Sequence, residues 1–441
     1  MQPLTAPAVP ANPGPKAARG RWIWRLSGVL TIGAIGAFGS FAIVRAVDPP
    51  QGPTPMSAVP TRIVTVTAPV TALNVQSYGA PIRVTTVPGG PVRIAESIMF
   101  GSGDGGPPTV TDTDSHGLLT LAAPACANSD CSVGFTVTVP SGVTVTAAAS
   151  GGGVTVTGTG AADIDSGGGP VYAAGVTGPL TVNAEGGGVT VSNATIADLD
   201  SGGGPVTASG ITSKLTVHAE GGGVTVSRAP TAAIDSGGGP VYAAGISGQL
   251  TVNAEGGGVT VTGAGATELD SGGGPVTAST ISGPLGVSAE GGGVEVSGVT
   301  GTLNVDTGGG PLSATSLTSP SATVNGDGGS VTLGFLTAPT SVRVDTGGGD
   351  ALLSVPGGPY AVAANTGGSQ ESVLIATSPG AASSISVTTD GGNLQIGPSG
   401  TSVSQSDSTG LTTGDGSPAQ PVRPVRPVRP VQPVKPVGQK G

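Results

Sequence analysis

Hydrophobic and polar residues alternate along most of this chain, and the alternation returns at a regular interval. Residues 154–157 (VTVT) and 180–184 (LTVNA) show the period-two pattern typical of a β-strand with one buried and one exposed face. The apolar positions form two rows, whose members are 17 or 18 residues apart at first and up to 20 apart later. The first row is Ile164, Val182, Leu199, Val217, Ile234, Val252, Leu269, Val287, Val305, Val324, Val344 and Val362, and the second is Val154, Val171, Val189, Val206, Val224, Val241, Val259, Val276, Val294, Leu312 and Val331.

A longer repeat is visible in the glycine residues. The triplet Gly-Gly-Gly begins at positions 151, 186, 221, 256 and 291, and a second set begins at 167, 202, 237 and 272. The interval of 35 residues indicates a repeat architecture in which two coils form one sequence repeat. A third, weaker apolar row lies between the other two and consists of Val176, Ile211, Ile246, Ile281, Val299, Leu317 and Leu336, with Ala194, Ala229 and Ala264 on alternate coils.

Three inward rows predict three short sides in each turn. The glycine content and the bias toward β-branched residues exclude helices over the repeats. The predicted fold class is all-β: a three-sided parallel β-solenoid, or single-stranded β-helix, with about 18 residues per turn. We expect the glycine triplets to supply positive φ angles at its corners. The residues that restart a strand after a triplet are Pro170, Pro205, Pro240 and Pro275.

The outward positions carry polar residues in a regular order. Adjacent turns of a solenoid stand about 4.8 Å apart, so acidic residues on every turn would repel one another. Here acidic and neutral residues alternate, which keeps the carboxylates about twice that distance apart. The row that alternates consists of Asp165, Asn183, Asp200, His218, Asp235, Asn253, Asp270, Ser288, Asp306 and Asn325. Glu185, Glu220, Glu255 and Glu290 also occur on every second turn. A separate outward row is mostly threonine and consists of Thr155, Tyr172, Thr190, Thr207, Thr225, Tyr242, Thr260, Thr277 and Glu295.

An apolar segment near the N-terminus predicts a membrane anchor. Residues 26–44 are 19 uncharged residues, a length sufficient to cross a bilayer as a helix. The basic residues before it are Lys16, Arg19, Arg21 and Arg25. They predict a signal-anchored, single-pass cell-membrane protein with a cytoplasmic N-terminus and an extracellular solenoid. The alternative is a cleaved signal peptide, for which Val44-Arg45-Ala46 is a poor cleavage site.

The chain divides into six predicted segments. They are a basic cytoplasmic N-terminus (1–25), a transmembrane anchor (26–45), a Pro-rich linker (46–60), an irregular β-rich N-terminal cap with two cysteines (61–140), the solenoid repeats (141–397) and a disordered Pro-Val-Arg tail (398–441). We expect the Pro-Val-Arg repeat to be extended, of the polyproline type, with its charges on Arg423, Arg426, Arg429, Lys435 and Lys440.

Charge is unevenly distributed along the chain. Residues 59–397 contain six basic and 23 acidic residues, a difference of −17, whereas the tail is basic. Anionic wall polymer, lipid headgroups and the acidic solenoid itself are candidate contacts for the tail, and a solvated tail without a contact is the alternative. Nucleic-acid binding is not indicated, because the basic residues lie at the chain ends and are not accompanied by aromatic residues.

The chain has two cysteines, Cys126 and Cys131. They lie close together in a segment that the predicted topology places outside the membrane, which favours a local disulfide between them. A metal site would need further soft ligands, and none is nearby in the sequence. A pair of free thiols is the alternative.

Residues 59–140 lead into the repeats through a recognisable succession of short motifs. Residues 117–121 (GLLTL) precede Cys126 and Cys131, and residues 135–145 (FTVTVPSGVTV) follow them. This succession resembles a bacterial family of adhesin-like domains of unknown function, also described as β-strand-repeat domains. Within that family, the chain resembles a membrane-anchored member of the actinobacterial type. The resemblance covers about residues 59–397. The chain departs from it in using Gly-Gly-Gly where many relatives have Gly-Asp. The resemblance implies surface display and no site residues.

These features predict a non-catalytic structural or adhesive envelope protein whose partner is a cell-wall or extracellular polymer. The alternative is a scaffold that assembles end to end through exposed terminal strands. The sequence singles out no catalytic, cofactor-binding or metal-ligating residue, and it predicts no cofactor. A polysaccharide-active enzyme would need clustered carboxylates with a base or metal, whereas here the acids form a uniform ladder. His218 shares the outward slot of Asn183 and Asn253, which indicates a surface residue.

Two surface-binding functions are less favoured. Thr-x-Thr or Thr-x-Ser pairs, as at residues 155–157, suggest an ice-binding face, but Tyr172, Tyr242 and Glu295 interrupt the row. Asp165 and its equivalents beside the glycine triplets resemble calcium-binding solenoids. Those use a nine-residue unit with the aspartate in the turn, whereas these aspartates recur every 35 residues at strand ends.

Overall fold

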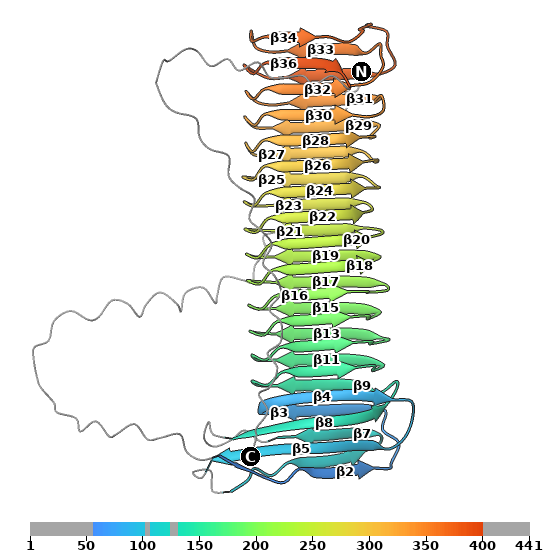
Figure 1. Ribbon diagram of the computed structural model, residues 1–441, viewed down its shortest axis with the longest axis vertical. Helices are drawn as coiled ribbons and strands as arrows, with labels where there is room; N and C mark the ends of the chain where they lie inside the picture. Colours follow the sequence, from blue (N-terminus) through green and yellow to red (C-terminus); the bar gives the residue numbers. More distant parts are fainter. Residues whose placement is uncertain (1–55, 102–105, 124–130, 400–441) are drawn as a thin grey trace, which may run out of the picture. The chain divides into compact units, whose positions relative to one another are not determined.

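A computed structural model of the chain describes residues 56–101, 106–123 and 131–399, and its secondary structure in these ranges consists of β-strands without a helix. The strands stack into a continuous parallel β-solenoid (Figure 1). From β9 to β32 the chain makes 12 coils in sequence order, with about 18 residues in each. The predicted all-β solenoid and its period are confirmed.

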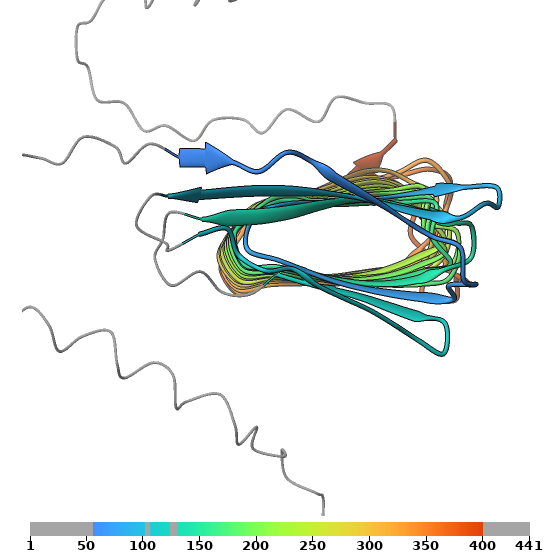
Figure 2. The same cartoon turned by 90° about the horizontal axis from the view of Figure 1, so that it is seen from below.

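Each coil contributes one strand to each of two sheets, which we name sheet A and sheet B. Figure 2 shows the two sheets facing each other across a narrow interior. From the N-terminal end of the stack, sheet A contains β1 (Met56–Ala58), β2 (Arg62–Val66), β5 (Val92–Gly101), β8 (Ser132–Pro140), β4 (Gly79–Val87), β10 (Val154–Thr157), β12 (Val171–Ala174), β14 (Val189–Ser192), β16 (Val206–Ser209), β18 (Val224–Ala229), β20 (Val241–Ile246), β22 (Val259–Ala264), β24 (Val276–Ile281), β26 (Val294–Val299), β28 (Leu312–Leu317), β30 (Val331–Phe335), β32 (Ala351–Val355), β36 (Leu394–Pro398) and β34 (Glu371–Val373).

Sheet B is built in the same way from the alternate strands. In the same direction it contains β6 (Thr111–Ser115), β7 (Leu118–Ala122), β3 (Ala72–Ser77), β9 (Thr144–Ala149), β11 (Ala161–Ser166), β13 (Pro179–Ala184), β15 (Ile196–Ser201), β17 (Lys214–Ala219), β19 (Thr231–Ser236), β21 (Leu250–Ala254), β23 (Thr267–Ser271), β25 (Leu285–Ala289), β27 (Leu303–Thr307), β29 (Ser321–Gly326), β31 (Ser341–Asp345), β35 (Ser384–Thr388) and β33 (Ala361–Asn365).

The two main apolar rows stack as the periodicity predicts. Ile164 pairs with Val182 and Val182 with Leu199 in sheet B, and all three side chains are buried. In sheet A, Val154 pairs with Val171 in the same manner. These rows face one another between the sheets and form one continuous aliphatic core, which removes apolar surface from water along the whole stack.

The prediction of a three-sided coil is wrong, because each of the 12 coils contains two strands. The residues of the third row other than Leu336 are buried, but they lie at the end of the sheet A strands or just after it, and not on a third sheet. In β20, for example, Ile246 ends a strand that begins at Val241, and it pairs with Ala229 and Ala264. The residue before each third-row position has a positive φ angle, which bends the strand so that two inward positions can be three residues apart. These residues include Gly175, Asn193, Gly210, Arg228, Gly245, Gly263, Thr280 and Gly298.

The glycine triplets have a different role from the one predicted. No glycine of the triplets between 151 and 293 has a φ angle in the left-handed region. Their backbone instead lies against the backbone of the neighbouring coil. A Cβ atom built on Gly257 would lie 2.1 Å from the carbonyl oxygen of Gly239, and one on Gly187 would lie 2.0 Å from that of Gly169. Glycine is required there because the coils approach too closely for any side chain.

The buried corner residues alternate with the two kinds of triplet. The Ser166 hydroxyl is buried and donates a hydrogen bond to the carbonyl oxygen of Gly169 at 2.8 Å. Ala184 occupies the equivalent position on the next coil. The same serine–glycine bond is made by Ser201, Ser236 and Ser271. One sequence repeat therefore contains two kinds of corner, which explains why the repeat is two coils long.

At the N-terminal end the coils are not stacked in sequence order. The coil formed by β3 and β4 lies between β7–β8 on one side and β9–β10 on the other. Beyond β7 and β8, the stack ends in antiparallel strands. In sheet A, β5 pairs with β8 and then with β1 and β2, and in sheet B β6 pairs with β7. The described residues between 61 and 140 therefore continue both sheets of the solenoid and form its N-terminal end.

The C-terminal end has the same inverted order. The coil formed by β35 and β36 lies between β31–β32 and the outer coil, β33–β34. Val344 consequently pairs with Val387, and Val362 pairs with Ile385, so the predicted succession of Val344 and Val362 in one row is wrong. Leu336 is also misplaced by the periodicity.

The misplacement of Leu336 has a local cause. The register between β28 and β30 shifts after Ala314, so that Phe335 pairs with Leu317. Phe335 is buried, whereas Leu336 is 63% exposed.

Candidate functional site

The outer face of sheet A carries almost no charge along its central coils. From β10 to β24 the outward strand positions hold threonine, serine, alanine, glycine and two tyrosines, and the one charged residue in these strands is Arg228 at the bend. Tyr172 and Tyr242 are 43% and 52% exposed. They belong to one outward row and stand four coils apart, about 19 Å at the strand spacing. Glu295 ends the uncharged stretch.

The outer face of sheet B is acidic. The pairing register places six aspartates in one outward row, each separated from the next by one coil with a neutral residue. We name this row the aspartate ladder: Asp165, Asp200, Asp235, Asp270, Asp306 and Asp345. Further acids share a strand with ladder members, namely Asp163, Asp198 and Glu268. The spacing of about 9.6 Å within the ladder is the one that the sequence predicts.

Polar residues between the ladder members partly stabilise the aspartate charges by donating hydrogen bonds to them. Asn253 donates a hydrogen bond to Asp235 at 3.4 Å, and Asn325 donates one to Asp306 at 3.3 Å. His218 lies between Asp200 and Asp235, with its Nδ1 3.6 Å from an Asp235 oxygen, and its side chain is about half exposed. The prediction that His218 is a surface residue is confirmed.

A small charged cluster closes the N-terminal end of the stack. Arg62 of β2 lies 3.1 Å from Asp112 of β6 and 3.6 Å from Glu96 of β5, so it links the outermost strands of the two sheets. Glu96 is buried, and its Oε1 has no hydrogen-bond partner among the described residues. Burial raises the pKa of Glu96, while the Arg62 guanidinium partly opposes the shift and Asp112 adds to it. The sequence pattern does not reveal this cluster, because its members lie 16 to 50 residues apart.

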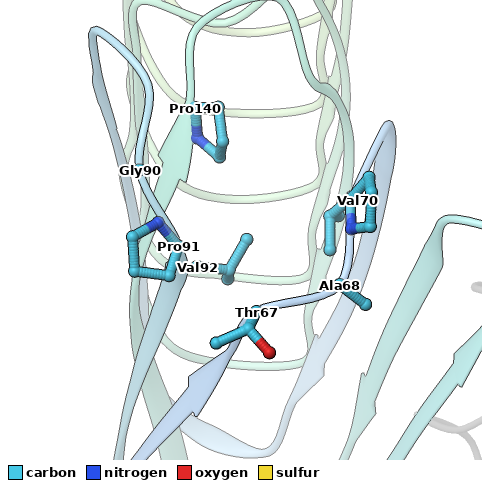
Figure 3. A pocket seen from close by; sticks show the side chains of 8 residues that line it. Thr67, Ala68, Val70, Gly90, Pro91, Val92 and Pro140 are labelled. Carbon is cyan, nitrogen blue, oxygen red and sulfur yellow. The ribbon is translucent and has the colours of Figure 1, made fainter.

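The same end of the stack has an apolar pocket of about 450 Å³. Figure 3 shows its lining, which comes from the loop after β2, the turn between β4 and β5, and the end of β8. The lining residues are Thr67, Ala68, Pro69, Val70, Gly90, Pro91, Val92 and Pro140. None of them is ionisable, and the Thr67 hydroxyl is the one polar side-chain group. The pocket therefore has no group for acid–base or nucleophilic chemistry.

Several sequence predictions fall on residues outside the described ranges. Cys131 is described and buried, but Cys126 lies outside, so the disulfide stays a prediction. The predicted membrane anchor (26–45) and the basic tail also lie outside. In the described part of the chain, no helix is long and apolar enough to cross a membrane.

The regular polar features of the described residues lie on the outer faces of the two sheets. Among them, no group of three His, Cys, Asp or Glu side chains could hold a metal ion. Comparison with protein-family models, with curated proteins and with solved structures finds no match for this chain. The two outer faces, one uncharged and one acidic, are therefore the candidate functional surfaces of the described part of the chain.

Proposed function

We propose that this chain is a membrane-anchored protein of the cell envelope, displayed outside the cell as a non-catalytic adhesive or structural module. The partner we infer is a neutral wall or extracellular polysaccharide. The observation that carries this proposal is the uncharged outer face of sheet A, where threonine and serine hydroxyls and two exposed tyrosines stand in register along eight coils, from β10 to β24.

Such a face is complementary to a polymer that is rich in hydroxyl groups. Threonine and serine donate and accept hydrogen bonds, and the tyrosine rings offer flat apolar surface with a polar tip. The repeat lets one polymer chain meet equivalent groups on successive coils, so weak contacts add along its length. The acidic face of sheet B disfavours anionic polymers on that side, which makes the neutral face the better contact.

A binding assay on insoluble neutral glycans tests this proposal. The full chain and a Tyr172→Ala/Tyr242→Ala variant are each incubated with a glucan, chitin and peptidoglycan, and the bound fraction is measured. We expect the variant to bind at least one of them roughly tenfold more weakly, because exposed aromatic residues carry much of the energy of such contacts. An Asp200→Asn/Asp235→Asn variant changes the opposite face and should bind as the parent does. Absence of binding to all three polymers would contradict the proposal.

The proposed location is tested separately on intact cells. The predicted topology places the solenoid outside the membrane, where added protease reaches it. Fragments of residues 56–399 should therefore be released from intact cells by protease shaving. If fragments appear only after lysis, the proposed surface display is wrong.

A scaffold that assembles through the ends of the stack is the second candidate. The observation that favours it is the C-terminal coil, in which β33 and β34 each pair with a strand on one side only. Such an edge can accept a strand of another chain. At the other end, β6 is fully exposed and carries Asp112 and Asp114, which disfavours pairing there. We therefore expect association of two C-terminal ends in preference to a filament, measurable as a dimer by light scattering.

A further inference from the structure

The aspartate ladder presents regularly spaced charges that other described residues leave largely uncompensated. Within the described ranges, one basic side chain lies within 4 Å of a ladder carboxylate, namely His218, whose Nδ1 is 3.6 Å from an Asp235 oxygen. The ladder runs over ten coil steps from Asp165 to Asp345, about 48 Å, with a carboxylate about every 9.6 Å. A ligand that matches it would carry cations at this interval along a straight line.

The C-terminal segment of the same chain carries cations at nearly this interval. Residues 421–435 repeat Pro-Val-X five times, and the X positions are Arg423, Arg426, Arg429, Gln432 and Lys435. The polyproline geometry predicted from this sequence has three residues per turn and a rise of about 3.1 Å, so every X side chain lies on one face, about 9.3 Å from the next. Over four intervals the two spacings diverge by about 1 Å.

We propose that residues 421–435 bind along the aspartate ladder of the same chain, with successive X residues opposite successive aspartates. The occupant is thus the chain's own basic tail, and the recognition is by charge and by spacing together. An arginine can meet a carboxylate through two parallel N–H donors, which favours Arg423, Arg426 and Arg429 in this role. The inference does not depend on the proposed function of sheet A.

The chain is long enough for this contact. The described part ends at Ser399, so residues 400–420 connect the fold to the repeat. These 21 residues can span up to about 70 Å, more than the length of the ladder. A tethered segment also has an effective concentration in the millimolar range, which allows individually weak surface ion pairs to hold it.

The glutamates at the corners are the competing site. Glu185, Glu220, Glu255 and Glu290 recur at the same two-coil interval. The ladder has the higher charge density, since Asp163, Asp198 and Glu268 add a second carboxylate on three of its strands. It also lies on the flat face of sheet B, where an extended segment can contact every second coil.

Zero-length carbodiimide cross-linking of the full chain, read by mass spectrometry, tests the proposal. We expect Lys435 to be joined to ladder aspartates within one molecule, with a yield that falls when salt is raised from 50 to 500 mM. An Asp200→Asn/Asp235→Asn/Asp270→Asn variant should lower the yield roughly tenfold, since three exposed ion pairs each worth about a factor of two are lost. Glu185→Gln/Glu220→Gln/Glu255→Gln makes the same charge change at the corners and should leave the yield unchanged.

A spacing variant tests recognition by interval. Inserting one alanine before each of Arg423, Arg426 and Arg429 keeps every charge but moves the arginines off one face and out of step with the ladder. We expect a loss comparable to that of the triple aspartate variant. An unchanged yield in the spacing variant, an equal loss in the glutamate variant, or cross-links found only between isotopically distinct copies would each overturn the proposal.

Discussion

At the scale of single residues, close approach of the backbone decides where glycine is needed. Gly257 and Gly273 belong to successive triplets, and neither has a φ angle in the left-handed region. A Cβ atom on Gly257 would lie 2.1 Å from the Gly239 carbonyl oxygen, whereas nothing lies within 4 Å of one on Gly273. A side chain is therefore excluded by the neighbouring coil at Gly257 but not at Gly273.

We predict that Gly257→Ala destabilises the solenoid and that Gly273→Ala does not. The added methyl group of the first variant must push two coils apart, which costs about 2 kcal/mol or more. In the second it projects into open space. Chemical denaturation monitored by far-UV circular dichroism measures the two free energies of unfolding. Equal losses in both variants would show that the close approach is not what requires glycine.

The left-handed positions before the third apolar row allow a stabilising substitution. Thr280 has a φ angle of 58° and is exposed, and the equivalent residues on the coils beside it are Gly263 and Gly298, with φ angles of 67° and 66°. A β-branched residue is strained in this region. Thr280→Gly is expected to raise the free energy of unfolding by about 1 kcal/mol. In the same strand Thr277→Gly is the control and should lower it, because glycine weakens a regular strand.

Glu96 gives the solenoid a pH-dependent stability. Burial raises the pKa of Glu96 above its ordinary value of 4.5 in the folded chain, so the folded state binds this proton more tightly than the unfolded state. The stabilisation by the protonated form is present below pH 4.5 and is lost as the pH rises through the raised pKa of the folded state.

We therefore predict that Glu96→Gln raises the melting temperature at pH 8, by an amount equivalent to roughly 1 kcal/mol, and changes little near pH 4. Melting curves over this pH range provide the measurement. Asp112→Asn removes the exposed partner of Arg62 and is the control, with a small effect that does not grow with pH. A stabilisation by Glu96→Gln that is larger at pH 4 than at pH 8 would contradict the assigned sign.

At the scale of elements, the sequence predicts the strands and their register better than the sides of the coil. The pairing of Ile164, Val182 and Leu199 follows from period-two alternation and equal spacing. The number of sheets does not follow, because a bend such as that at Gly245 adds an inward residue, Ile246, without starting a new strand. The inward rows of the sequence therefore predict which residues are buried, but they do not predict the number of sheets.

The order of the end coils is likewise not visible in the sequence. The spacing from Val344 to Val362 equals one coil, yet β35 lies between their strands. A local period cannot show that a later segment is inserted between two earlier ones, since the insertion depends on contacts between residues more than 20 positions apart. The charged cluster of Arg62, Glu96 and Asp112 escapes sequence analysis for the same reason.

The inverted order predicts an unusual gradient of hydrogen exchange. The strand β35 pairs with β31 and β33, whereas β33 pairs with β35 alone. Backbone amides of residues 384–388 should therefore exchange more slowly than those of residues 361–365, although they are nearer the C-terminus. Native-state exchange read by mass spectrometry tests this, with residues 321–326 of β29 as a reference that is paired on both sides. Fastest exchange in residues 384–388 would contradict the coil order.

At the scale of the whole molecule, the solenoid is built from pairs of unlike coils. One coil has the corner Ser-Gly-Gly-Gly-Pro and a ladder aspartate, and the next has the corner Glu-Gly-Gly-Gly and a neutral residue at the ladder position. Because each coil contacts its two neighbours, the stability of the stack is close to a sum of nearest-neighbour terms. Each aspartate-bearing coil is most stable between two coils with a neutral residue at the ladder position, since this arrangement keeps the aspartates about 9.6 Å apart.

Duplicating coils inside the chain tests this rule. A second copy of residues 189–223, which are two coils, preserves the alternation, and we expect it to leave the melting temperature unchanged or higher. A second copy of residues 189–205, a single coil, places Asp198 and Asp200 beside their own duplicates at about 4.8 Å. Like charges directly opposite in a sheet are destabilising, so this variant should lose about 1–2 kcal/mol for its two rows.

Salt separates the electrostatic part of this loss from a misfit of the corners. At 1 M salt the Debye length falls to about 3 Å, so the repulsion between the duplicated aspartates is screened and the single-coil variant should recover most of its stability. Thermal unfolding at low and high salt measures the recovery. If the single-coil and two-coil variants are equally stable at low salt, the alternation of acidic and neutral coils has no part in holding the stack together. A loss in the single-coil variant that salt does not reduce would instead assign the alternation to the stacking of serine corners on alanine corners, as Ser166 stacks on Ala184.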